Sequence, residues 1–388
     1  MGRTVVVVGA GVFGTTAAAE LAARGWSVTL VDPAGDSPHP EAASTDIAKM
    51  IRADYGTDGL YIDLMDECFP IWREWNTRWD SNRFHEDGFL ILAGGPMEPG
   101  GYEHTSYHTL LDRGYPLEHL DTTAIGDRFP LFQPPVGTEA YLNPIGGWAE
   151  SGWVVGALLQ ETVAAGVRRV DQRVARLHTD GDMVEGVVLD DGERVDADLT
   201  IVTAGAWTAE LVPGLDRLIT TTGHPIMHFR PEDPTPYRAS AYPPWAADIA
   251  NTGWYGFPAI DGVVKVANHG PGLPIQAAAP RSVADDWEPR FRSFLSAWIP
   301  VLADAPVVYT RLCLYTDTTD GDFLIDKHPG LGGLVVATGG SGHGFKFAPI
   351  LGRLIADVAD GAEPLERFRW RIPSVAAKEP ARHLGDRP

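Results

Sequence analysis

One of only two cysteines in this chain of 388 residues stands where covalent chemistry could occur. Cys313 belongs to the stretch "RLCLYTDTTDGDFLIDKHP" (311–329), two residues after Arg311. A thiolate is a good nucleophile when a nearby cation or dipole lowers its pKa, so Cys313 is a candidate nucleophile. The alternative is a small buried hydrophobic side chain, the usual state of a free cysteine, and that alternative suits Cys68 in an apolar helical stretch.

The second chemical signature is a glycine pattern near the N-terminus. Gly9, Gly11 and Gly14 form G-x-G-x-x-G between a β-branched run and an alanine-rich segment typical of a helix. Such glycines allow a tight turn and close approach of a pyrophosphate, and the helix N-terminus offers it N–H groups. Asp32 ends the next expected strand, where it can accept hydrogen bonds from a ribose hydroxyl. The unit predicts dinucleotide binding. The alternative is a glycine turn that serves only to pack a Rossmann-like unit and binds no ligand.

This unit does not separate NAD from FAD, because both bind their adenosine half in the same way. The stretch "LTIVTAGAWTAEL" (199–211) favours FAD. It is a strand that ends near Ala204 and Gly205 and returns the chain toward the cofactor, as in flavoenzymes with an interrupted FAD domain.

Four stretches resemble the FAD-dependent amine oxidases of the D-amino-acid oxidase superfamily, in the branch of monomeric sarcosine oxidase and the fructosyl-amino-acid oxidases (amadoriases). They are "VVVVGAGVFGTTAAAELAARGWSVTLVD", "STDIAKMIRADYG" (44–56), the Cys313 stretch and "VVATGGSGHGFKFAPILG". The similarity runs through most of the chain, and the last two stretches are the most specific. The resemblance implies an α/β fold in which a Rossmann-type FAD-binding domain is interleaved with a β-rich α+β substrate domain.

The resemblance also implies how the cofactor is held. The matching cysteine in the family is joined to the flavin 8-methyl group, so we expect covalent FAD at Cys313. A dense glycine loop lets backbone N–H groups approach the flavin or the substrate. The further cofactor contacts implied are Ser44, Thr45, Gly340, Gly342, Gly344 and Lys346.

Lys265 and His269 are the first candidates for catalysis. In "GVVKVANHG", alternation places Val264 and Val266 on one face of a strand and Lys265 on the other. Sequence alone would suggest a solvent-exposed lysine. The resemblance instead implies a cation beside the flavin that promotes reaction with oxygen, by stabilising negative charge that develops there. His269 matches a histidine near the substrate; its alternative is a structural histidine.

Arg52 and Lys346 are the candidate substrate clamp. In the family an arginine and a lysine at these positions hold the substrate carboxylate, and the planar guanidinium can pair with two oxygens at once. The alternative for each is a surface ion pair. Tyr315 falls where a tyrosine lines the substrate cavity. The resemblance implies that Lys49 stands above the flavin, where sarcosine oxidases have arginine and amadoriases have lysine, so the motifs point to different substrates. Lys49 and Tyr315 are further candidates for catalysis, and Tyr315 is also a candidate substrate contact.

Two further residues receive weaker assignments. His343, within the glycine loop, is expected to be structural. Asp317 could pair with a substrate ammonium, but we expect it to start a turn.

The elements that must position these residues suggest two interwoven domains. Helix is expected within 44–79, from 152 and after 346, and short glycine-punctuated strands from 88 onward. We predict an FAD-binding domain of residues 1–80, 146–215 and 322–388, and a substrate domain of 81–145 and 216–321.

Composition excludes several classes of protein. Net charge is −21, which argues against binding to nucleic acid or to an anionic membrane. Two cysteines exclude a disulfide framework and a multi-cysteine zinc site, and no metal is expected. With no signal peptide or membrane span visible, we expect a cytoplasmic protein, and we predict a monomer.

The sequence thus predicts an FAD-dependent oxidase that converts a secondary amine of an amino acid to an imine, with O2 reduced to hydrogen peroxide. Its partners would be that amine substrate and O2. The alternatives are an amadoriase-type fructosyl-amino-acid oxidase, a flavin dehydrogenase or desaturase of a cyclic imino acid, and a non-catalytic dinucleotide sensor.

Overall fold

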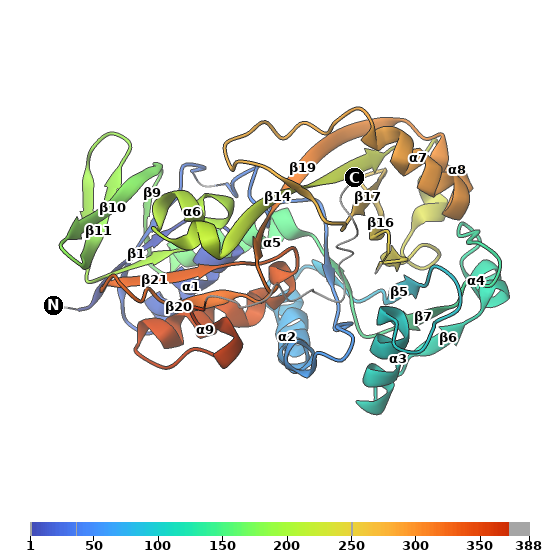
Figure 1. The fold of residues 1–388 in the computed structure, drawn as a ribbon, viewed down its shortest axis with the longest axis horizontal. Helices are drawn as coiled ribbons and strands as arrows, with labels where there is room; N and C mark the ends of the chain where they lie inside the picture. The colour runs from blue at the N-terminus through green and yellow to red at the C-terminus, as the bar shows by residue number, and fades with distance from the viewer. Residues whose placement is uncertain (1, 36, 250, 372–388) are drawn as a thin grey trace.

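Two β-sheets dominate the structure, a computed structural model that describes residues 2–35, 37–249 and 251–371. A six-stranded sheet lies at the left of Figure 1 and a nine-stranded sheet at the right. The long paired strands β14 (Ile219–Phe229) and β19 (Val307–Thr318) run between the two halves. None of the helices within the described ranges is long and apolar enough to cross a membrane.

The six-stranded sheet is parallel except at one edge. Its order is β20-β21-β13-β1-β2-β9, and β20 is antiparallel to β21. Its strands come from three separate stretches of the chain, so the sheet joins segments that are far apart in the sequence. The predicted strands on either side of the glycine motif are confirmed as β1 and β2. The bounds are β1 (Thr4–Val8), β2 (Ser27–Val31), β9 (Arg168–Val170), β13 (Leu199–Val202), β20 (Leu324–Lys327) and β21 (Leu334–Thr338).

Alternation along β1 explains how both faces of this sheet become buried. Val5 and Val7 pack in one apolar cluster with the helices, whereas Val6 and Val8 pack in another with a three-stranded antiparallel sheet. A strand covered on both faces is apolar at every position, which is why the run is continuous. The covering elements are α1 (Val12–Ala23), α5 (Ser151–Ala164), α9 (Ala348–Ala359), β10 (Val174–Asp180), β11 (Met183–Leu189) and β12 (Arg194–Asp196).

The nine-stranded sheet is mostly antiparallel. Its main path is β18-β14-β17-β16-β15-β5-β7-β6, β19 pairs with β14, and β15 runs parallel to β5. The other strands are β5 (Phe89–Leu92), β6 (Glu118–Leu120), β7 (Ala140–Asn143), β15 (Trp245–Ala247), β16 (Trp254–Ile260), β17 (Val263–Asn268) and β18 (Leu273–Pro274).

The two faces of this sheet have different partners. Val264 and Val266 of β17 share an apolar cluster with Phe291 and Leu295 of a covering helix. Lys265 points to the opposite face, toward the other half of the molecule, and is fully buried there. The predicted alternation is confirmed, but the face that carries Lys265 is buried and not exposed to solvent. The covering helices are α4 (Thr122–Arg128), α7 (Trp287–Trp298) and α8 (Pro300–Ala303).

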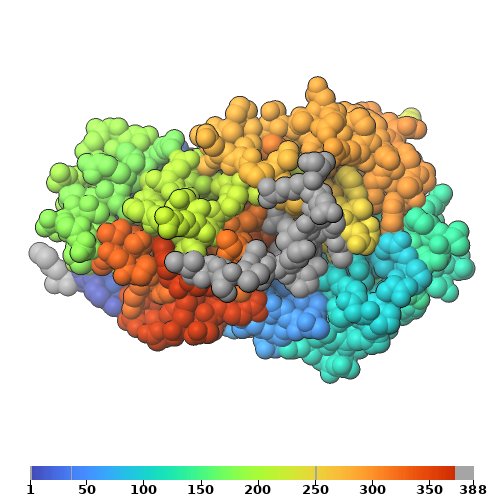
Figure 2. Space-filling model, in the orientation of Figure 1, coloured from blue at the N-terminus to red at the C-terminus, as the bar shows by residue number. Residues whose placement is uncertain are grey.

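Helix α2 (Gly59–Arg78) lies where the two halves meet. In Figure 2 the blue residues near 60–70 lie between the red residues of α9 and the cyan residues of the nine-stranded half. The prediction of helix from residue 44 is wrong for its first part, because the helix begins only after its N-cap Asp58. Before it, β3 pairs with β8, so distant partners override the local pattern.

Asp317 also differs from its prediction. It lies within β19, opposite Thr220 of β14, and its carboxylate accepts a hydrogen bond from the Thr222 hydroxyl. The turn begins two residues later. The remaining elements are β3 (Lys49–Ile51), β4 (Phe84–His85), β8 (Gly147–Ala149), α3 (Tyr102–Asp112), α6 (Thr208–Leu211), η1 (Gly205–Trp207), η2 (Leu215–Arg217), η3 (Thr235–Tyr237), η4 (Gly344–Phe347) and η5 (Glu366–Phe368).

Candidate active site

A cavity of about 590 Å³ extends from the carboxyl ends of β1 and β2 to the junction of the two halves. Its walls come from segments that are far apart in the sequence, which is why no single stretch of sequence outlines it. The lining residues lie within 8–13, 31–33, 39–44, 172–175, 203–207, 314–316 and 337–345, with Lys49, Glu210, Leu211 and Ala278.

Most of the residues predicted to bind the cofactor line this cavity. Four of the predicted residues, Gly14, Thr45, Cys313 and Lys346, are not among its lining residues. The main-chain oxygen of Thr45 accepts a hydrogen bond from Arg311 (2.8 Å). The predicted residues that do line it are Gly9, Gly11, Asp32, Ser44, Ala204, Gly205, Gly340, Gly342 and Gly344.

The glycine loop leaves room for a dinucleotide at the start of α1. A Cβ on Gly14 would lie 1.8 Å from the main-chain oxygen of Gly9, whereas the nearest atom to a Cβ on Gly11 would be Ser44 Oγ at 3.4 Å. Asp32 is buried beside the loop, and its two carboxylate oxygens accept hydrogen bonds from the N–H groups of Ala10 (2.8 Å) and Ala34 (2.9 Å). The loop, the helix N-terminus and the oriented carboxylate fit the adenosine and pyrophosphate groups of FAD.

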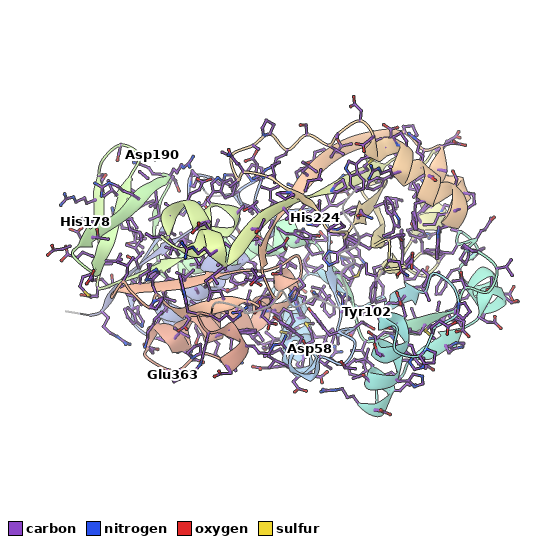
Figure 3. The ribbon with its side chains drawn as sticks, viewed as in Figure 1. Asp58, Tyr102, His178, Asp190, His224 and Glu363 are labelled. Carbon is purple, nitrogen blue, oxygen red and sulfur yellow. The ribbon has the colours of Figure 1, made fainter. Side chains whose placement is uncertain are left out.

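A second, smaller cavity of about 80 Å³ adjoins the first on the side of the nine-stranded sheet. Lys49, Tyr315, Gly342 and Phe345 line both cavities, so the two cavities share a wall. In Figure 3, Tyr102, which lines the smaller cavity, lies far from His178 and Asp190 at the left end of the molecule. The remaining lining residues are Met50, Arg52, Phe89, Ile91, Tyr102, Ala246, Ile249, Tyr255, Phe257, His269, His343 and Lys346.

The two predicted clamp residues meet at one aromatic ring. The Arg52 guanidinium lies 5.0 Å and Lys346 Nζ 5.3 Å from the centre of the Tyr55 ring. Arg52 also donates to the main-chain oxygen of Asp54 and to the Tyr102 hydroxyl (3.2 Å). Burial raises the pKa of Asp54, and the Arg52 charge opposes that rise. Among the described residues that line it, the smaller cavity has the buried cations Arg52 and Lys346 and no carboxylate.

Tyr315 joins the cavity to a short polar chain. Its hydroxyl lies 3.3 Å from His269 Nδ1 and 3.4 Å from the Tyr255 hydroxyl, and its ring stacks on His224 with 3.8 Å between ring centres. Burial raises the pKa of Tyr255, so that hydroxyl stays protonated at neutral pH. The predicted residues Tyr315 and His269 thus lie together in the wall of the smaller cavity, and Tyr315 also lines the larger one.

Lys265 is paired with Asp46, a residue that the sequence analysis did not single out. Lys265 Nζ donates to Asp46 Oδ2 (2.7 Å) and to the main-chain oxygen of Ala48 (2.8 Å). Lys49 and Arg311 lie 3.8 Å and 3.7 Å from the same carboxylate. One sequence signal was present: Asp46 is the only acid of the "STDIAKMIR" stretch.

Burial and the neighbouring charges oppose each other in this cluster. Burial lowers the pKa of Lys265 to about 8, while the Asp46 carboxylate limits the fall. Burial would raise the pKa of Asp46, but the Lys265 and Lys49 charges hold it well below its usual range. Burial lowers the pKa of His228, 4.0 Å from Asp46, to about 4, so this histidine is neutral at pH 7.

Cys313 is buried in β19, and its sulfur lies 3.7 Å from Lys49 Nζ. The cation beside it is thus Lys49; Arg311, which the sequence suggested, points instead to the oxygens of Pro40 and Thr45. Cys68 is buried in α2, and burial raises its thiol pKa well above the usual value, as expected for an unreactive side chain.

Comparison with known proteins agrees with this geometry. A family profile described as FAD dependent oxidoreductase (DAO) matches residues 4–358. The chain belongs to this family. It is therefore a flavoprotein oxidoreductase with FAD as its cofactor, and the predicted recognition and enzyme class are confirmed.

Individual relatives span nearly the whole chain. The N-methyl-L-tryptophan oxidase of Salmonella typhimurium is 28% identical over 366 residues, 92% of this chain and 95% of its own length. The fructosamine oxidase (Amadoriase II) of Aspergillus fumigatus is similar in structure with a TM-score of 0.85 at 26% identity, over 99% of this chain and 94% of that one. The fructosyl peptide oxidase of E. terrenum shares the fold, with a TM-score of 0.83 at 23% identity over 97% and 93% of the two chains. The predicted fold class is confirmed.

Proposed function

We propose that this protein oxidises the secondary amine of an N-substituted amino acid and passes the electrons to O2. The amine loses a hydride equivalent from carbon and a proton from nitrogen. The resulting imine adds water and separates into a carbonyl compound and an amine. O2 takes up the two electrons and two protons as hydrogen peroxide. Bound FAD supplies the two-electron redox chemistry, and the protein supplies binding and orientation.

The smaller cavity carries this proposal. Arg52 and Lys346 both line this cavity and both lie within about 5 Å of the Tyr55 ring centre, and we infer that a substrate carboxylate pairs with them. The same positive charges disfavour a protonated amine, because a second cation would be repelled. The substrate amine would then bind in its neutral form, which is the form that can lose a hydride equivalent. Tyr315 and Gly342 mark the wall through which it would reach the larger cavity.

The apolar part of the wall favours an N-methyl amino acid with an apolar or aromatic side chain. A fructosyl group would bring several hydroxyls, and each one buried without a partner costs about 1–3 kcal/mol. A ring or branched alkyl group would instead gain about 25 cal/mol per Å² of apolar surface removed from water. N-methyl-L-tryptophan oxidases among the relatives agree with this choice. The apolar lining residues are Met50, Phe89, Ile91, Ala246, Ile249 and Phe257.

A fructosyl-amino acid is the second candidate substrate. Lys49 is the amadoriase-type residue at its position, and it lines both cavities. The structural similarity to the fructosamine oxidase also supports this candidate. Tyr255 and Tyr315 would offer hydroxyls to a sugar in the smaller cavity.

Covalent attachment of FAD at Cys313 belongs to the same proposal. The two residues that follow it, Leu314 and Tyr315, line the larger cavity. Lys49 Nζ lies 3.7 Å from the sulfur, so a lysine stands beside the proposed point of attachment.

Peroxide formation under air tests the proposal. Purified protein should release hydrogen peroxide with N-methyl-L-tryptophan or N-methyl-L-phenylalanine, and much less with tryptophan or phenylalanine, which lack the N-methyl group. Turnover of fructosyl-valine in preference to both N-methyl amino acids would favour the second candidate. Turnover of proline or pipecolate without peroxide would indicate a dehydrogenase or desaturase and contradict the proposal.

A further inference from the structure

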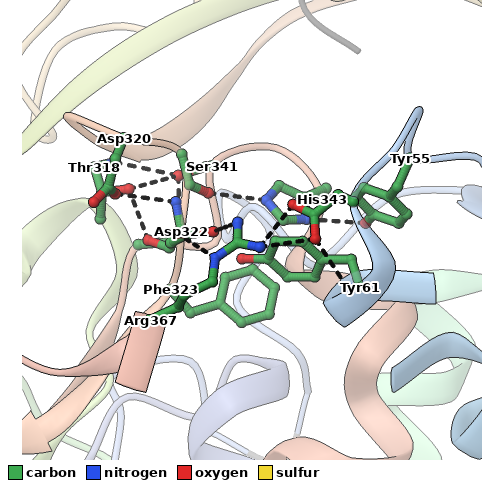
Figure 4. Close-up of polar contacts among 12 residues, drawn as sticks. Tyr55, Tyr61, Thr318, Asp320, Asp322, Phe323, Ser341, His343 and Arg367 are labelled. Atoms are coloured by element: carbon green, nitrogen blue, oxygen red, sulfur yellow. Dashed lines mark hydrogen bonds and ion pairs between the residues drawn. The ribbon is translucent and has the colours of Figure 1, made fainter. Parts of the chain in front are cut away.

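Lys346 begins a chain of hydrogen bonds in the wall of the smaller cavity. Lys346 Nζ donates to the Tyr55 hydroxyl (3.0 Å) and to the main-chain oxygen of His343 (3.0 Å). The Tyr55 hydroxyl lies 3.0 Å from His343 Nδ1, and His343 Nε2 lies 3.0 Å from the main-chain oxygen of Gly321. Figure 4 shows Tyr55, His343 and the turn around Asp320 and Asp322 in this order.

The Lys346 ammonium can only donate and the Gly321 carbonyl can only accept, and together they fix the direction of each hydrogen bond between them. The carbonyl of Gly321 can only accept, so His343 Nε2 must carry its proton. In a neutral imidazole Nδ1 is then an acceptor, and the Tyr55 hydroxyl donates to it. The Tyr55 oxygen is thereby directed to accept from the Lys346 ammonium. The four groups form one ordered relay from Lys346 through Tyr55 and His343 to Gly321.

We propose that Tyr55 and His343 are positioning residues that hold the Lys346 ammonium for the substrate carboxylate, and that they do so only while His343 is neutral. This inference rests on the proposed function, since it needs a carboxylate in the smaller cavity. Protonated His343 would donate from both nitrogens. The Tyr55 hydroxyl would lose its acceptor, and the new charge would repel Lys346 across Tyr55.

The outer end of the relay is held firmly. The His343 ring stacks on Phe323 (4.9 Å between ring centres), and Tyr61 of α2 packs edge-on against it (4.9 Å). Arg367 donates to Asp322 Oδ2 (2.8 Å) and bridges the two oxygens of Asp58 at the start of α2 (2.7 and 2.8 Å). These contacts tie the turn that carries Gly321 to α2, so the relay has a fixed anchor.

Several titratable or charged groups surround His343 and bear on its protonation. They lie on each element packed against it: the segment before α2, α2 itself, the turn before β20, η4 and η5. Burial raises the pKa of Tyr61 well above its usual value, so this neighbour stays uncharged. Within the part of the chain that the structure describes, the groups are Tyr55, Tyr61, Asp322, Lys346 and Arg367.

Binding of benzoate to the holoenzyme tests the relay without any turnover. Benzoate offers a carboxylate and an aromatic ring but has no amine to oxidise; benzamide has the same ring without the charge. By titration calorimetry at pH 8, Tyr55→Phe should weaken benzoate binding about tenfold, because Lys346 loses a charge-assisted hydrogen bond. Benzamide binding should not change. Tyr61→Phe is the matched control, since Tyr61 packs on the same histidine without bonding Lys346, and it should bind benzoate like the wild type.

The pH profile separates positioning from a merely structural role. Wild-type affinity for benzoate should fall at acid pH in a step that benzamide lacks. His343→Gln, which keeps one donor and one acceptor but does not titrate, should retain binding and lose the step. Unchanged benzoate affinity in Tyr55→Phe, or an acid step that persists in His343→Gln, would overturn the relay and leave amine oxidation unaffected. A wild type that binds benzamide but not benzoate would overturn both the clamp and the relay.

Discussion

Replacing Asp46 by Asn should separate the reaction with oxygen from the reaction with the amine. Asp46 is the counter-ion of Lys265, which we propose promotes reoxidation by O2, and the two groups are 2.7 Å apart in a buried site. Asparagine keeps the size and the hydrogen-bonding oxygen but removes the negative charge. The Lys265 ammonium would then face Lys49 and Arg311 without compensation.

The size of the effect follows from the burial of the pair. Removing one partner of a buried ion pair costs about 3 kcal/mol or more. One pKa unit corresponds to about 1.4 kcal/mol. The pKa of Lys265, which burial lowers to about 8 in the wild type, should therefore fall by about two units in Asp46→Asn. At pH 7.5 the wild-type lysine is mostly charged, whereas the variant lysine would be mostly neutral.

Stopped-flow mixing of substrate-reduced protein with oxygenated buffer measures the consequence. In the wild type the reoxidation rate should fall as pH rises through about 8, because Lys265 loses its proton there. In Asp46→Asn the rate at pH 7.5 should be at least about tenfold lower, and it should recover as pH is lowered by about two units.

Two matched variants complete this experiment. Lys265→Met should slow reoxidation at every pH, and adding Asp46→Asn to it should change the rate little further. Anaerobic reduction by substrate should be affected much less in all three variants. An unchanged pH midpoint in Asp46→Asn, or equal losses in reduction and reoxidation, would refute this role of the pair.

Three further changes test other parts of the site. Cys313→Ser should let acid precipitation release all of the flavin into the supernatant, whereas flavin should stay with the precipitated wild-type protein; release from both would rule out attachment here. Gly14→Ala places a methyl group 1.8 Å from a backbone oxygen, so purified protein should contain little FAD by absorbance, and full occupancy would contradict the packing. Cys68→Ser buries a hydroxyl in an apolar site and should lower the free energy of unfolding by about 1–3 kcal/mol. The FAD content per folded protein should stay unchanged. Equal unfolding midpoints of variant and wild type in denaturant would argue against that burial.

The sequence predicts those parts of the fold that are determined by residues close together in the chain. The strand, glycine turn and helix around Gly9 and Gly14 were predicted because each element has its own periodicity and the turn its own steric demand. Alternation alone assigned Lys265 to the correct face of β17. In both cases the information lies within about ten residues of the feature.

The rest depends on contacts that no local pattern contains. The segment before Asp58 is held by pairing of β3 with β8, a hundred residues away, so its helix-like spacing was misleading. Asp317 continues a strand because β14 lies beside it. The role of Asp46 depends on Lys265 and Arg311, which β17 and β19 bring beside it from distant parts of the sequence. The role of Tyr55 likewise depends on its contacts with His343 and Lys346.

Anaerobic bleaching of the bound flavin tests the central claim most directly, because it reports amine oxidation without any later step. Protein at equal concentration is mixed without oxygen with N-methyl-L-tryptophan, sarcosine, tryptophan, fructosyl-valine or pipecolate, and the yellow absorbance is followed. Fastest bleaching by N-methyl-L-tryptophan, with little by tryptophan, is the predicted result. Absence of bleaching by every secondary amine would contradict the assignment of this chain as an oxidase of N-substituted amino acids.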